Sequence, residues 1–410
     1  MTLGSRLLGI LRSEPLVRFA DRISLRTRPG RPPGETAVLI APPGRGNIGD
    51  QALVEAFVEA LSSPVIVVVR AAEDIDVPPH LAERMSILPL PALIYGTAIG
   101  RGRDARKLAV ALRGAGSISI VGADIMDGAY VPRASVNRAS LGERLAVLGW
   151  PVRVIGFSWN SAPLPSALAA LVRADAAGVR LLVRDPLSAA RARADGLSVR
   201  DTADVVFLAT SKDDSIIHEL TQGEPYALVN ASGLVGADDG LLAQYDGIIG
   251  ALRERGLRVI VLPHVSRPGA DDLPLCTAIS ERAQTAEGPA VTLVPRLLTP
   301  PQVRGLAGSA TVVVTGRMHL AVMSLMSGTP AITVSTQGKV EGLMDLFDAP
   351  QFCVEPGPQL GADVIERLAA VLADPAATRA HLIERLPAVE MLAQENVEGL
   401  QVLREEAIRT

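Results

Sequence analysis

From Thr36 onward, short runs of β-branched and apolar residues alternate with segments whose apolar residues recur at helical spacing. This alternation is typical of α/β folds built on parallel sheets. The run VIVVV at 65–69 is apolar on both faces, as expected of a strand that helices cover on each side. A first series of strands is predicted at Ala37–Ala41, Pro64–Val69, Ser117–Gly122, Val152–Trp159 and Val179–Arg184. Helices are predicted between several of them, at Gln51–Leu61, Arg103–Arg113, Ser140–Leu148 and Pro163–Ala177.

The same alternation restarts after Lys212. The second series of strands is predicted at Tyr226–Asn230, Arg258–Pro263, Val291–Val294, Thr311–Val314, Ala331–Ser335 and Phe352–Val354. Its helices are predicted at Gly240–Arg255, Asp271–Gln284, Pro300–Ala307, His319–Met326 and Lys339–Phe347. A chain of 410 residues is too long for one ordinary core, so two doubly wound, Rossmann-like lobes are expected.

We expect the two lobes to face a central cleft in a GT-B-like arrangement. The predicted division is an N-terminal extension at 1–35, a first lobe at 36–212, a second lobe at 213–375 and a C-terminal segment at 376–410. The stretch 211–214 is the linker candidate, and a last helix over 376–404 is expected to cross back over the first lobe. Ligands of parallel sheets bind beyond the carboxyl ends of the strands, so the loops that follow strands are searched for chemistry.

Charge and composition exclude several partners. The net charge is −4 and aromatic residues make up 3% of the chain, which argues against a nucleic-acid-binding surface. No apolar run has the roughly 18 residues that a membrane span requires. Residues 1–35 carry seven arginines against three acids and form either a basic amphipathic segment on a membrane surface or a helix packed on the protein. A cytoplasmic location, at most peripheral to the membrane, is expected.

The first loop of interest follows the strand at 37–41 and contains Gly44, Gly46 and Gly49 in the pattern GxGxxG. This pattern between a strand and a helix is the dinucleotide fingerprint, but two prolines precede it and the next strand ends at Arg70 rather than at an acid. Asp50 is either a partner of the helix dipole or a group near an acceptor hydroxyl. We interpret Gly46, Asn47, Gly49 and Asp50 as the acceptor-facing wall.

The second loop follows the strand at 311–314 and carries Arg317 and His319 in the first turn of an apolar helix. Cationic groups at the end of a buried strand are costly unless they point toward solvent or a ligand. One strand later, residues 336–339 read TQGK, and Lys339 opens the next helix as a further candidate for binding an anion. Arg317, His319 and Lys339 are therefore predicted to hold an anionic donor.

Three more strand ends supply candidates. Arg184 follows the strand at 179–183 and is either a donor ligand or half of a local salt bridge. His264 ends the strand at 258–263, with two aspartates soon after it, and is either structural or a donor contact. Asp124, with Asp127 nearby, is a candidate on the acceptor side. No spacing of histidines and carboxylates predicts a catalytic metal.

Taken together, these loops resemble the polysaccharide pyruvyl transferase family. The resemblance is carried, in the expected order, by GRGNIGDQAL (44–53), VRDPLS (183–188), LPH (262–264), TGRMHLAVM (315–323), GTPAI (328–332) and KVEGL (339–343). The segments at 122–126 and 156–160 depart from the family, which often shows a glycine cluster at the first of them.

The resemblance implies transfer of pyruvate from phosphoenolpyruvate onto sugar hydroxyls as a ketal, without a further cofactor, on a glycan or lipid-linked sugar of a bacterial cell envelope. It implies that Arg184 and Arg317 bind the donor with help from Lys339 and His264. His319 and Asp50 would share the acid and base roles, because an imidazole exchanges its proton near neutral pH. The alternatives are a nucleotide-sugar glycosyltransferase of GT-B fold, a non-catalytic binding protein and a nicotinamide-dependent oxidoreductase.

Overall fold

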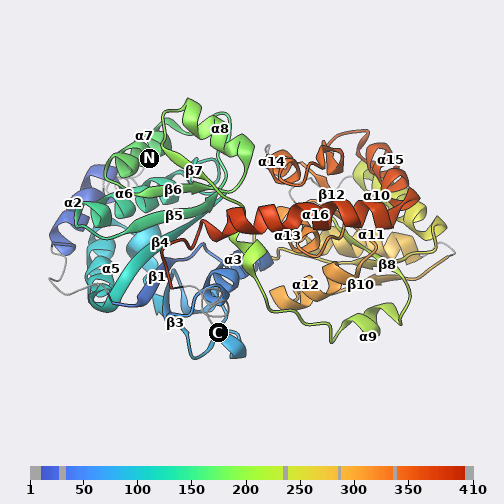
Figure 1. Cartoon of the computed structure of the whole chain (residues 1–410), viewed down its shortest axis with the longest axis horizontal. Coiled ribbons are helices and arrows are strands. Elements are labelled where there is room, and N and C mark those ends of the chain that lie inside the picture. Colours follow the sequence, from blue (N-terminus) through green and yellow to red (C-terminus); the bar gives the residue numbers. More distant parts are fainter. Residues whose placement is uncertain (1–10, 27–33, 234–238, 285–287, 336–338, 402–410) are drawn as a thin grey trace, which may run out of the picture. The chain divides into compact units, whose positions relative to one another are not determined.

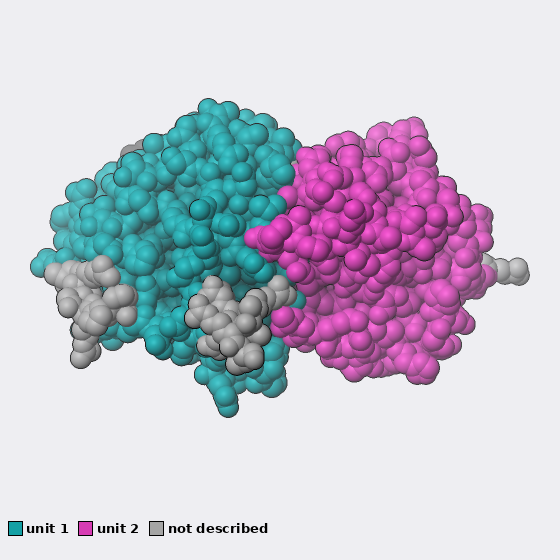
Figure 2. Space-filling model, viewed as in Figure 1, with its two compact units in different colours: residues 1–44, 53–209, 392–410 teal, residues 45–52, 210–391 magenta. Residues whose placement is uncertain are grey.

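The computed structural model describes residues 11–26, 34–233, 239–284, 288–335 and 339–401, and the chain forms two compact units (Figures 1 and 2). Unit 1 comprises residues 1–44, 53–209 and 392–410, and unit 2 comprises residues 45–52 and 210–391. Short segments from elsewhere in the sequence thus join each unit. The unit boundary after residue 209 lies beside the stretch 211–214 that the sequence suggested as a linker.

Unit 1 is built on a parallel sheet of seven strands in the order β3-β2-β1-β4-β5-β6-β7. The strands are β1 Thr36–Ile40, β2 Val65–Val69, β3 Met85–Pro89, β4 Ala115–Ala123, β5 Val152–Phe157, β6 Arg180–Val183 and β7 Val199–Asp201. The helices around it are α2 Glu14–Ser24, α3 Ile48–Glu59, α4 Pro91–Tyr95, α5 Ala98–Ala111, α6 Pro132–Val147, α7 Pro165–Ala176 and α8 Pro186–Ala194. Short 3₁₀ helices are η1 Ala72–Asp74, η2 Pro79–Leu81, η3 Leu112–Gly114 and η4 Val205–Leu208.

The five strands predicted for this lobe are present, and two edge strands were missed. The central strand β5 is buried along its whole length, which is why its apolar run is so clear in the sequence. The outer strands β3 and β7 are largely exposed or half-buried, and β7 has only three residues. An edge strand needs neither two apolar faces nor great length, so the apolar pattern that marks a buried strand is weak there.

Unit 2 repeats the design with a parallel sheet of six strands in the order β10-β9-β8-β11-β12-β13. The strands are β8 Tyr226–Asn230, β9 Arg258–Val261, β10 Val291–Leu293, β11 Val312–Thr315, β12 Ala331–Val334 and β13 Cys353–Val354. The helices are α9 Ile217–Thr221, α10 Asp239–Glu254, α11 Leu273–Gln284, α12 Pro300–Ser309, α13 Met318–Leu325, α14 Val340–Asp345, η5 Pro350–Phe352, α15 Leu360–Ala373 and α16 Pro375–Gln394. The predicted fold class of two Rossmann-like lobes is confirmed.

The C-terminal helix was predicted too long. Helix α16 ends at Gln394, and the chain continues in turns to residue 401. Within unit 1, the side chain of Asn396 accepts a hydrogen bond from the Gly156 amide at 3.1 Å and donates one to the Ala203 carbonyl at 2.8 Å. The buried Asn396 therefore fixes this segment beside strand β5 in place of further helical turns.

Part of the basic N-terminal extension forms helix α2, and residues 1–10 and 27–33 lie outside the described residues. The buried Asp21 of α2 accepts two hydrogen bonds from Arg101 of α5, at 2.8 and 2.7 Å. The two helices pack against each other, and α2 also packs against α6. Among the described helices, none combines the length and the apolar character that a membrane crossing requires.

Candidate active site

The glycine loop that the sequence places in the first lobe packs on unit 2. Asn47 forms an antiparallel bridge with Val265, and the Ile48 amide donates to the His264 carbonyl at 3.2 Å. On the other side, the Ser266 amide donates to the Gly46 carbonyl at 2.8 Å. These backbone bonds attach the loop to the segment that follows β9, which brings the GRGNIG and LPH motifs together.

Two glycines of the loop are required by close packing. Gly46 has φ +72°, a conformation that disfavours other residues, and a Cβ there would lie 2.2 Å from the Ser266 carbonyl oxygen. A Cβ at Gly49 would lie 2.3 Å from Nδ1 of His319. The imidazole of His319 therefore packs directly on the backbone of the glycine loop. In both places the protein itself occupies the space that glycine leaves, so these glycines have a structural role without a dinucleotide.

Arg317 is held by Asp272, a residue that the sequence analysis mentioned only as a neighbour of His264. The Nε atom of Arg317 donates to both oxygens of Asp272 at 3.1 and 3.2 Å, and Nη2 donates to Asp272 and, at 3.1 Å, to the Ala270 carbonyl. Nη1 has no partner among the described residues. Asp272 thus orients the guanidinium and leaves one of its corners available to a ligand.

Asp272 organises the surrounding backbone as well. Its fully buried carboxylate accepts hydrogen bonds from the side chain of Asn230 and from the amides of Gly233, His264 and Val265, at 2.9–3.1 Å. Burial alone would raise the pKa of Asp272, but the hydrogen bond and positive charge of Arg317, with these donors, hold it below its usual value. Asp272 is therefore a carboxylate that joins the ends of β8 and β9 to the start of α13.

His264 is buried and neutral. Burial, followed by the nearby charge of His319, lowers the pKa of His264 from 6.5 to about 3, against the opposing effect of Asp272. Neither ring nitrogen has a hydrogen-bond partner among the described residues. A neutral imidazole with both nitrogens unengaged can accept or donate a hydrogen bond according to its tautomer.

The other candidates of unit 2 lie on the neighbouring loops. Asp50, almost buried, is 3.5 Å from Nη1 of Arg267, a cation that the sequence analysis did not single out. Lys339 is half-buried at the N-cap of α14, while residues 336–338 of the predicted TQGK segment lie outside the described residues. The structure thus brings Gly46, Asn47, Gly49, Asp50, His264, Arg317 and His319 together around the carboxyl ends of β9 and β11.

Arg184 and Asp124 form a separate cluster at the end of the unit 1 sheet. The buried Arg184 donates from Nε to Ser158 Oγ at 2.9 Å, from Nη1 to Asp204 at 3.0 Å and from Nη2 to Asp124. Each of its three nitrogens therefore has a partner. Burial lowers the pKa of Arg184, but the charges of Asp124 and Asp204 outweigh this effect and raise it.

The loop after β4 bends sharply just before Asp124. Ala123 has φ +43°, in the left-handed region that favours glycine. This residue lies in the segment where the family often has glycines. Nearby, the buried Asp127 accepts a hydrogen bond from Asn160 at 2.7 Å, and burial raises its pKa. The Ser158 amide donates to the Ala123 carbonyl at 2.9 Å, so the two segments that depart from the family pattern are in contact with each other.

Sequence reasoning missed the partners that hold these arginines. Asp204 occurs 20 residues after Arg184 and Asp272 occurs 45 residues before Arg317, so no short motif connects either pair. The available signal was weaker: Asp272 is the second residue of the helix predicted at Asp271–Gln284 and follows a strand-ending histidine by eight residues. Within the described part of the chain, no group of three or more histidines, cysteines and acids is arranged to hold a metal ion.

Comparison with known proteins gives one family. The family model described as polysaccharide pyruvyl transferase matches residues 47–338, a span that includes both the glycine loop and the loop of Arg317. Among curated proteins, none matches the sequence.

Solved structures share the fold at low identity. A UDP-N-acetylglucosamine 2-epimerase described as putative, from Listeria monocytogenes, has a TM-score of 0.57 at 10% identity, covering 86% of this chain and 91% of that one. The UDP-GlcNAc 2-epimerase of Neisseria meningitidis has a TM-score of 0.55 at 10% identity, with coverages of 92% and 99%. Phytolacca americana UGT2 has a TM-score of 0.51 at 13% identity, with coverages of 93% and 100%. At these identities the likeness shows a GT-B-like fold.

Proposed function

The chain belongs to the polysaccharide pyruvyl transferase family, and from that premise we propose that it transfers the enolpyruvyl group of phosphoenolpyruvate onto hydroxyls of a glycan as a ketal. One observation carries the proposal: Arg317, with a corner of its guanidinium unengaged, lies beside His264 and His319 at the carboxyl end of β11. A donor with a carboxylate and a phosphate requires several such groups.

The proposed reaction begins with protonation of the donor's methylene carbon, C3, which leaves positive charge on C2. A first sugar hydroxyl then bonds to C2 and loses its proton. The bond between C2 and the phosphate oxygen breaks, and a second hydroxyl closes the ketal. The two hydroxyl protons balance the proton gained by C3 and the proton carried away with inorganic phosphate.

We assign Arg317 to the donor's anionic groups, with Lys339 assisting from α14. A guanidinium that Asp272 already orients loses little further freedom when it binds an oxyanion. Lys339 lies at a helix start, where the backbone amides also favour negative charge. Neutral His264 suits a hydrogen bond to a phosphate or carboxylate oxygen without adding charge.

His319 and Asp50 are the proposed proton-transfer groups. His319 packs on Gly49, the residue just before Asp50, so both groups lie where α13 meets the glycine loop. An imidazole and a carboxylate can protonate C3 and accept the hydroxyl proton, in either assignment.

Arg184 and Asp124 contact each other, but we propose different roles for them. Asp124 is partly exposed and contacts Arg184, so we assign it to the acceptor's hydroxyls. Arg184 was predicted to bind the donor, but it is already paired with Asp124 and Asp204. Binding the donor would require Asp124 to release its hydrogen bond to Arg184. We propose a cytoplasmic reaction, because phosphoenolpyruvate is made there, with a cell-envelope glycan or lipid-linked sugar as acceptor.

The test is thermal unfolding with phosphoenolpyruvate against UDP, GDP and NAD, followed by phosphate release with candidate glycans. We expect stabilisation by phosphoenolpyruvate, since a ligand that binds only the folded state raises its stability. His319→Ala should lower turnover by about 10²–10⁴-fold. His218→Ala, at an exposed position of α9, is the matched control. Stabilisation by UDP and not by millimolar phosphoenolpyruvate would overturn the donor assignment.

A further inference from the structure

Unit 1 contains a second arginine at the carboxyl edge of its sheet that the proposed reaction does not use. Arg138 of α6 is fully buried and donates from Nη2 to the Ala41 carbonyl at 2.8 Å. Its Nε and Nη1 atoms have no hydrogen-bond partner among the described residues. A buried guanidinium with two unengaged nitrogens destabilises the folded state, because those groups lose their hydrogen bonds to water and gain none in return.

Arg138 lines a pocket beyond the ends of β1 and β2. The pocket is lined by Ile40, Ala41, Pro42, Val68, Val69, Arg70, Leu90, Leu93, Ile94, Tyr95 and Arg138. No carboxylate lines it. The second cation, Arg70, is 2.9 Å from Asp74 and lies over the Tyr95 ring at 5.8 Å, so Arg138 is the cation without a carboxylate partner.

Position and chemistry both indicate a ligand. The pocket lies at the edge of a parallel sheet where ligands bind, and its walls are apolar apart from two guanidiniums and one phenol. The free space in the pocket is about 10 Å³, room for about one water-sized atom, so a carboxylate or phosphate oxygen that completes the hydrogen bonding of Arg138 must also displace neighbouring side chains. We infer that unit 1 holds an oxyanion-binding site at Arg138, made of other residues than the proposed donor site, and that it takes a carboxylate or phosphate group.

The assignment of that oxyanion to the acceptor glycan rests on the proposed function. An acidic sugar anchored by its carboxylate and a free phosphate share the chemistry that Arg138 recognises. Thermal unfolding with glucuronate, inorganic phosphate and neutral glucose distinguishes these sources. We expect glucuronate or phosphate to raise the unfolding temperature and glucose to leave it unchanged.

The decisive variant is Arg138→Met, which removes the charge and keeps most of the volume. It should lose most of the anion-induced shift while unfolding, without ligand, at the same or a higher temperature, because replacing a poorly paired buried charge by an apolar group is often neutral or stabilising. Arg133→Met, on the same helix but bonded to the Tyr95 carbonyl, is the control that should keep the shift. Arg138→Lys should bind the anion at least about 10-fold more weakly, because it loses the guanidinium fork.

Two sites are separated by reciprocal variants. Arg138→Met should keep the response to phosphoenolpyruvate and lose that to glucuronate, and Arg317→Lys should do the reverse. If phosphoenolpyruvate fails to bind the natural protein, the proposed function falls while the glucuronate arm still tests Arg138. An anion response that survives Arg138→Met, or equal loss of stability in both Arg138 variants, would overturn the site.

A different observation concerns the outer face of unit 1. Helices α2 and α5 each turn a stripe of cationic and apolar side chains to solvent, which we call the α2–α5 face. Its exposed members are Phe19, Arg22, Ile23, Ile99, Arg103, Arg106, Lys107 and Val110, with Arg26 just after the end of α2. Asp104, the one acid of α5, is buried, and in α2 Asp21 is buried and Glu14 half-buried. Every fully exposed charge on these two helices is thus positive, in a chain whose net charge is −4.

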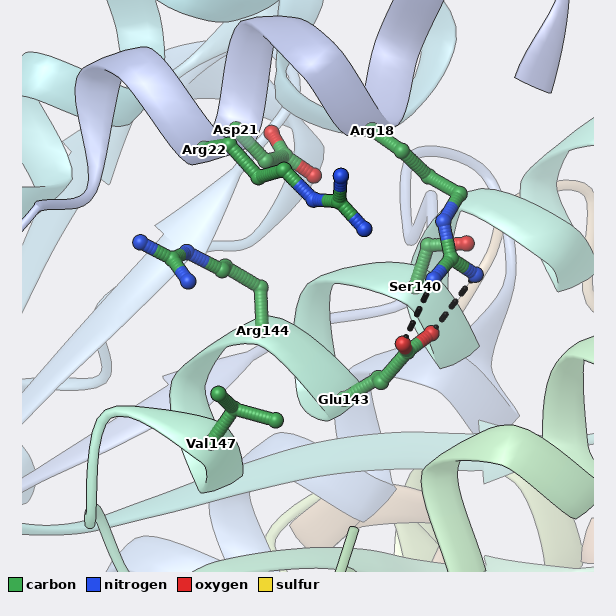
Figure 3. A pocket seen from close by; sticks show the side chains of 7 residues that line it. All are labelled: Arg18, Asp21, Arg22, Ser140, Glu143, Arg144 and Val147. Carbon is green, nitrogen blue, oxygen red and sulfur yellow. Dashed lines mark hydrogen bonds and ion pairs between the residues drawn. The ribbon is translucent and has the colours of Figure 1, made fainter. Parts of the chain in front are cut away.

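A pocket beside this face adds one further cation without a carboxylate partner, Arg144 (Figure 3). It is lined by Arg18, Asp21, Arg22, Ser140, Glu143, Arg144 and Val147, from α2 and α6. Glu143 accepts two hydrogen bonds from Arg18, at 2.8 and 2.6 Å, and Asp21 is paired with Arg101. Neither Arg22 nor Arg144 is paired with a carboxylate among the described residues. Val147 at the edge of this pocket is exposed, at 63%, as is Phe19 of α2, at 59%.

The combination points to one class of partner. Cations interleaved with large apolar side chains suit the surface of a bilayer, where phosphates meet the first methylenes of the chains. We propose that the α2–α5 face docks on a membrane rich in anionic lipids, with a headgroup phosphate between Arg22 and Arg144.

Sedimentation with vesicles tests this docking. The natural protein should bind phosphatidylcholine vesicles containing phosphatidylglycerol, bind pure phosphatidylcholine weakly, and dissociate as salt is raised. Reversing Arg103, Arg106 and Lys107 to glutamate should weaken binding on the order of 100-fold. The control reverses Arg255, Arg296 and Arg367 of unit 2, with the same change of net charge. Equal effects of the two triple variants, or tighter binding to duplex DNA than to the vesicles, would overturn the proposal.

Discussion

The two sheets have the same strand order around their first strands, but the arginines at their carboxyl edges contact different numbers of carboxylates. In unit 1, β1 lies between β2 and β4, and in unit 2, β8 lies between β9 and β11. Arg184 directly follows β6 in unit 1, and Arg317 follows β11 in unit 2. Arg184 of unit 1 has a partner for every nitrogen, including two carboxylates, whereas Arg317 of unit 2 has one carboxylate and an unengaged Nη1.

This difference separates an arginine that is used for structure from one that is available to a ligand. A guanidinium with two carboxylates carries no net attraction for a further anion, while one with a single carboxylate is oriented and still able to bind. This difference supports our proposal that the anionic donor binds to unit 2 and that Asp124 of unit 1 contacts the acceptor's hydroxyls. The following variants test it.

The largest expected effect is that of Asp272→Ala. It leaves the partly buried Arg317 without its carboxylate and removes the acceptor of three backbone amides, so unit 2 should lose about 3–5 kcal/mol of stability. Asp124→Ala should cost less, about 1–2 kcal/mol, because Arg184 keeps Asp204. Both tryptophans, Trp150 and Trp159, lie in unit 1, so their fluorescence in urea reports unit 1 alone while circular dichroism reports both units.

For Asp272→Ala, the circular dichroism transition should therefore shift to lower urea before the fluorescence transition does. Equal destabilisation by Asp272→Ala and Asp124→Ala would remove the distinction between the two arginines.

The next effect is on activity. In Gly49→Ala the new Cβ would lie 2.3 Å from Nδ1 of His319, so the imidazole must move. A displacement of about 1 Å at a reacting group lowers turnover by about 100-fold. Gly250→Ala of α10, where nothing lies within 4 Å, should leave kcat/KM unchanged and add about 0.5–1 kcal/mol of stability. Phosphate release measures both; normal turnover in Gly49→Ala would separate His319 from the reaction.

A smaller effect appears in the pH dependence of stability. His264 has a pKa of about 3 in the folded protein and an ordinary pKa of 6.5. At pH values between these two, the unfolded chain binds a proton at this residue and the folded chain does not. Stability should therefore fall with decreasing pH, by up to about 1.4 kcal/mol per pH unit from this group. Unfolding curves of His264→Gln should lack that slope between about pH 6 and about pH 4.5, above the range where carboxylates titrate. If stability depended on pH in the same way in both proteins, His264 would not be buried as proposed.

The smallest effect concerns the loop of unit 1. Ala123→Gly relieves a left-handed residue at φ +43° and should stabilise unit 1 by about 0.5–1 kcal/mol. Gly128→Ala, at φ +82° and with its Cβ 3.0 Å from that of Leu164, should do the opposite. Tryptophan fluorescence during heating measures both. A loss of stability in Ala123→Gly would mean that the neighbouring contacts, and not the backbone angle, govern this loop.

The sequence was most informative where a segment is buried on both faces. Strand β8 was predicted with its observed bounds, and the other central strands to within three residues, because their apolar runs reflect burial along the segment itself. The strands β3 and β7 were missed because their half-exposed residues lack that pattern. The end of α16 was missed because Asn396, and no local breaker, stops the helix.

For the site, the order of motifs was enough to identify the family and to name His319, Arg317 and Asp50 as candidates. It did not indicate that the glycine loop is hydrogen-bonded to the strand end of His264, or that Asp272 orients Arg317. Those partners are tens to hundreds of residues apart, and no periodicity connects them.

The sequence by itself thus determined two parallel α/β sheets and the set of loops that follow their strands, because burial and helix starts leave local patterns. Only the tertiary structure decided that every nitrogen of Arg184 has a hydrogen-bond partner while Nη1 of Arg317 has none among the described residues. That difference depends on how many acceptors the fold brings within hydrogen-bond distance. The tertiary structure also decided that Gly49 meets His319, a contact between residues 270 positions apart that only the packing of α13 on the glycine loop creates.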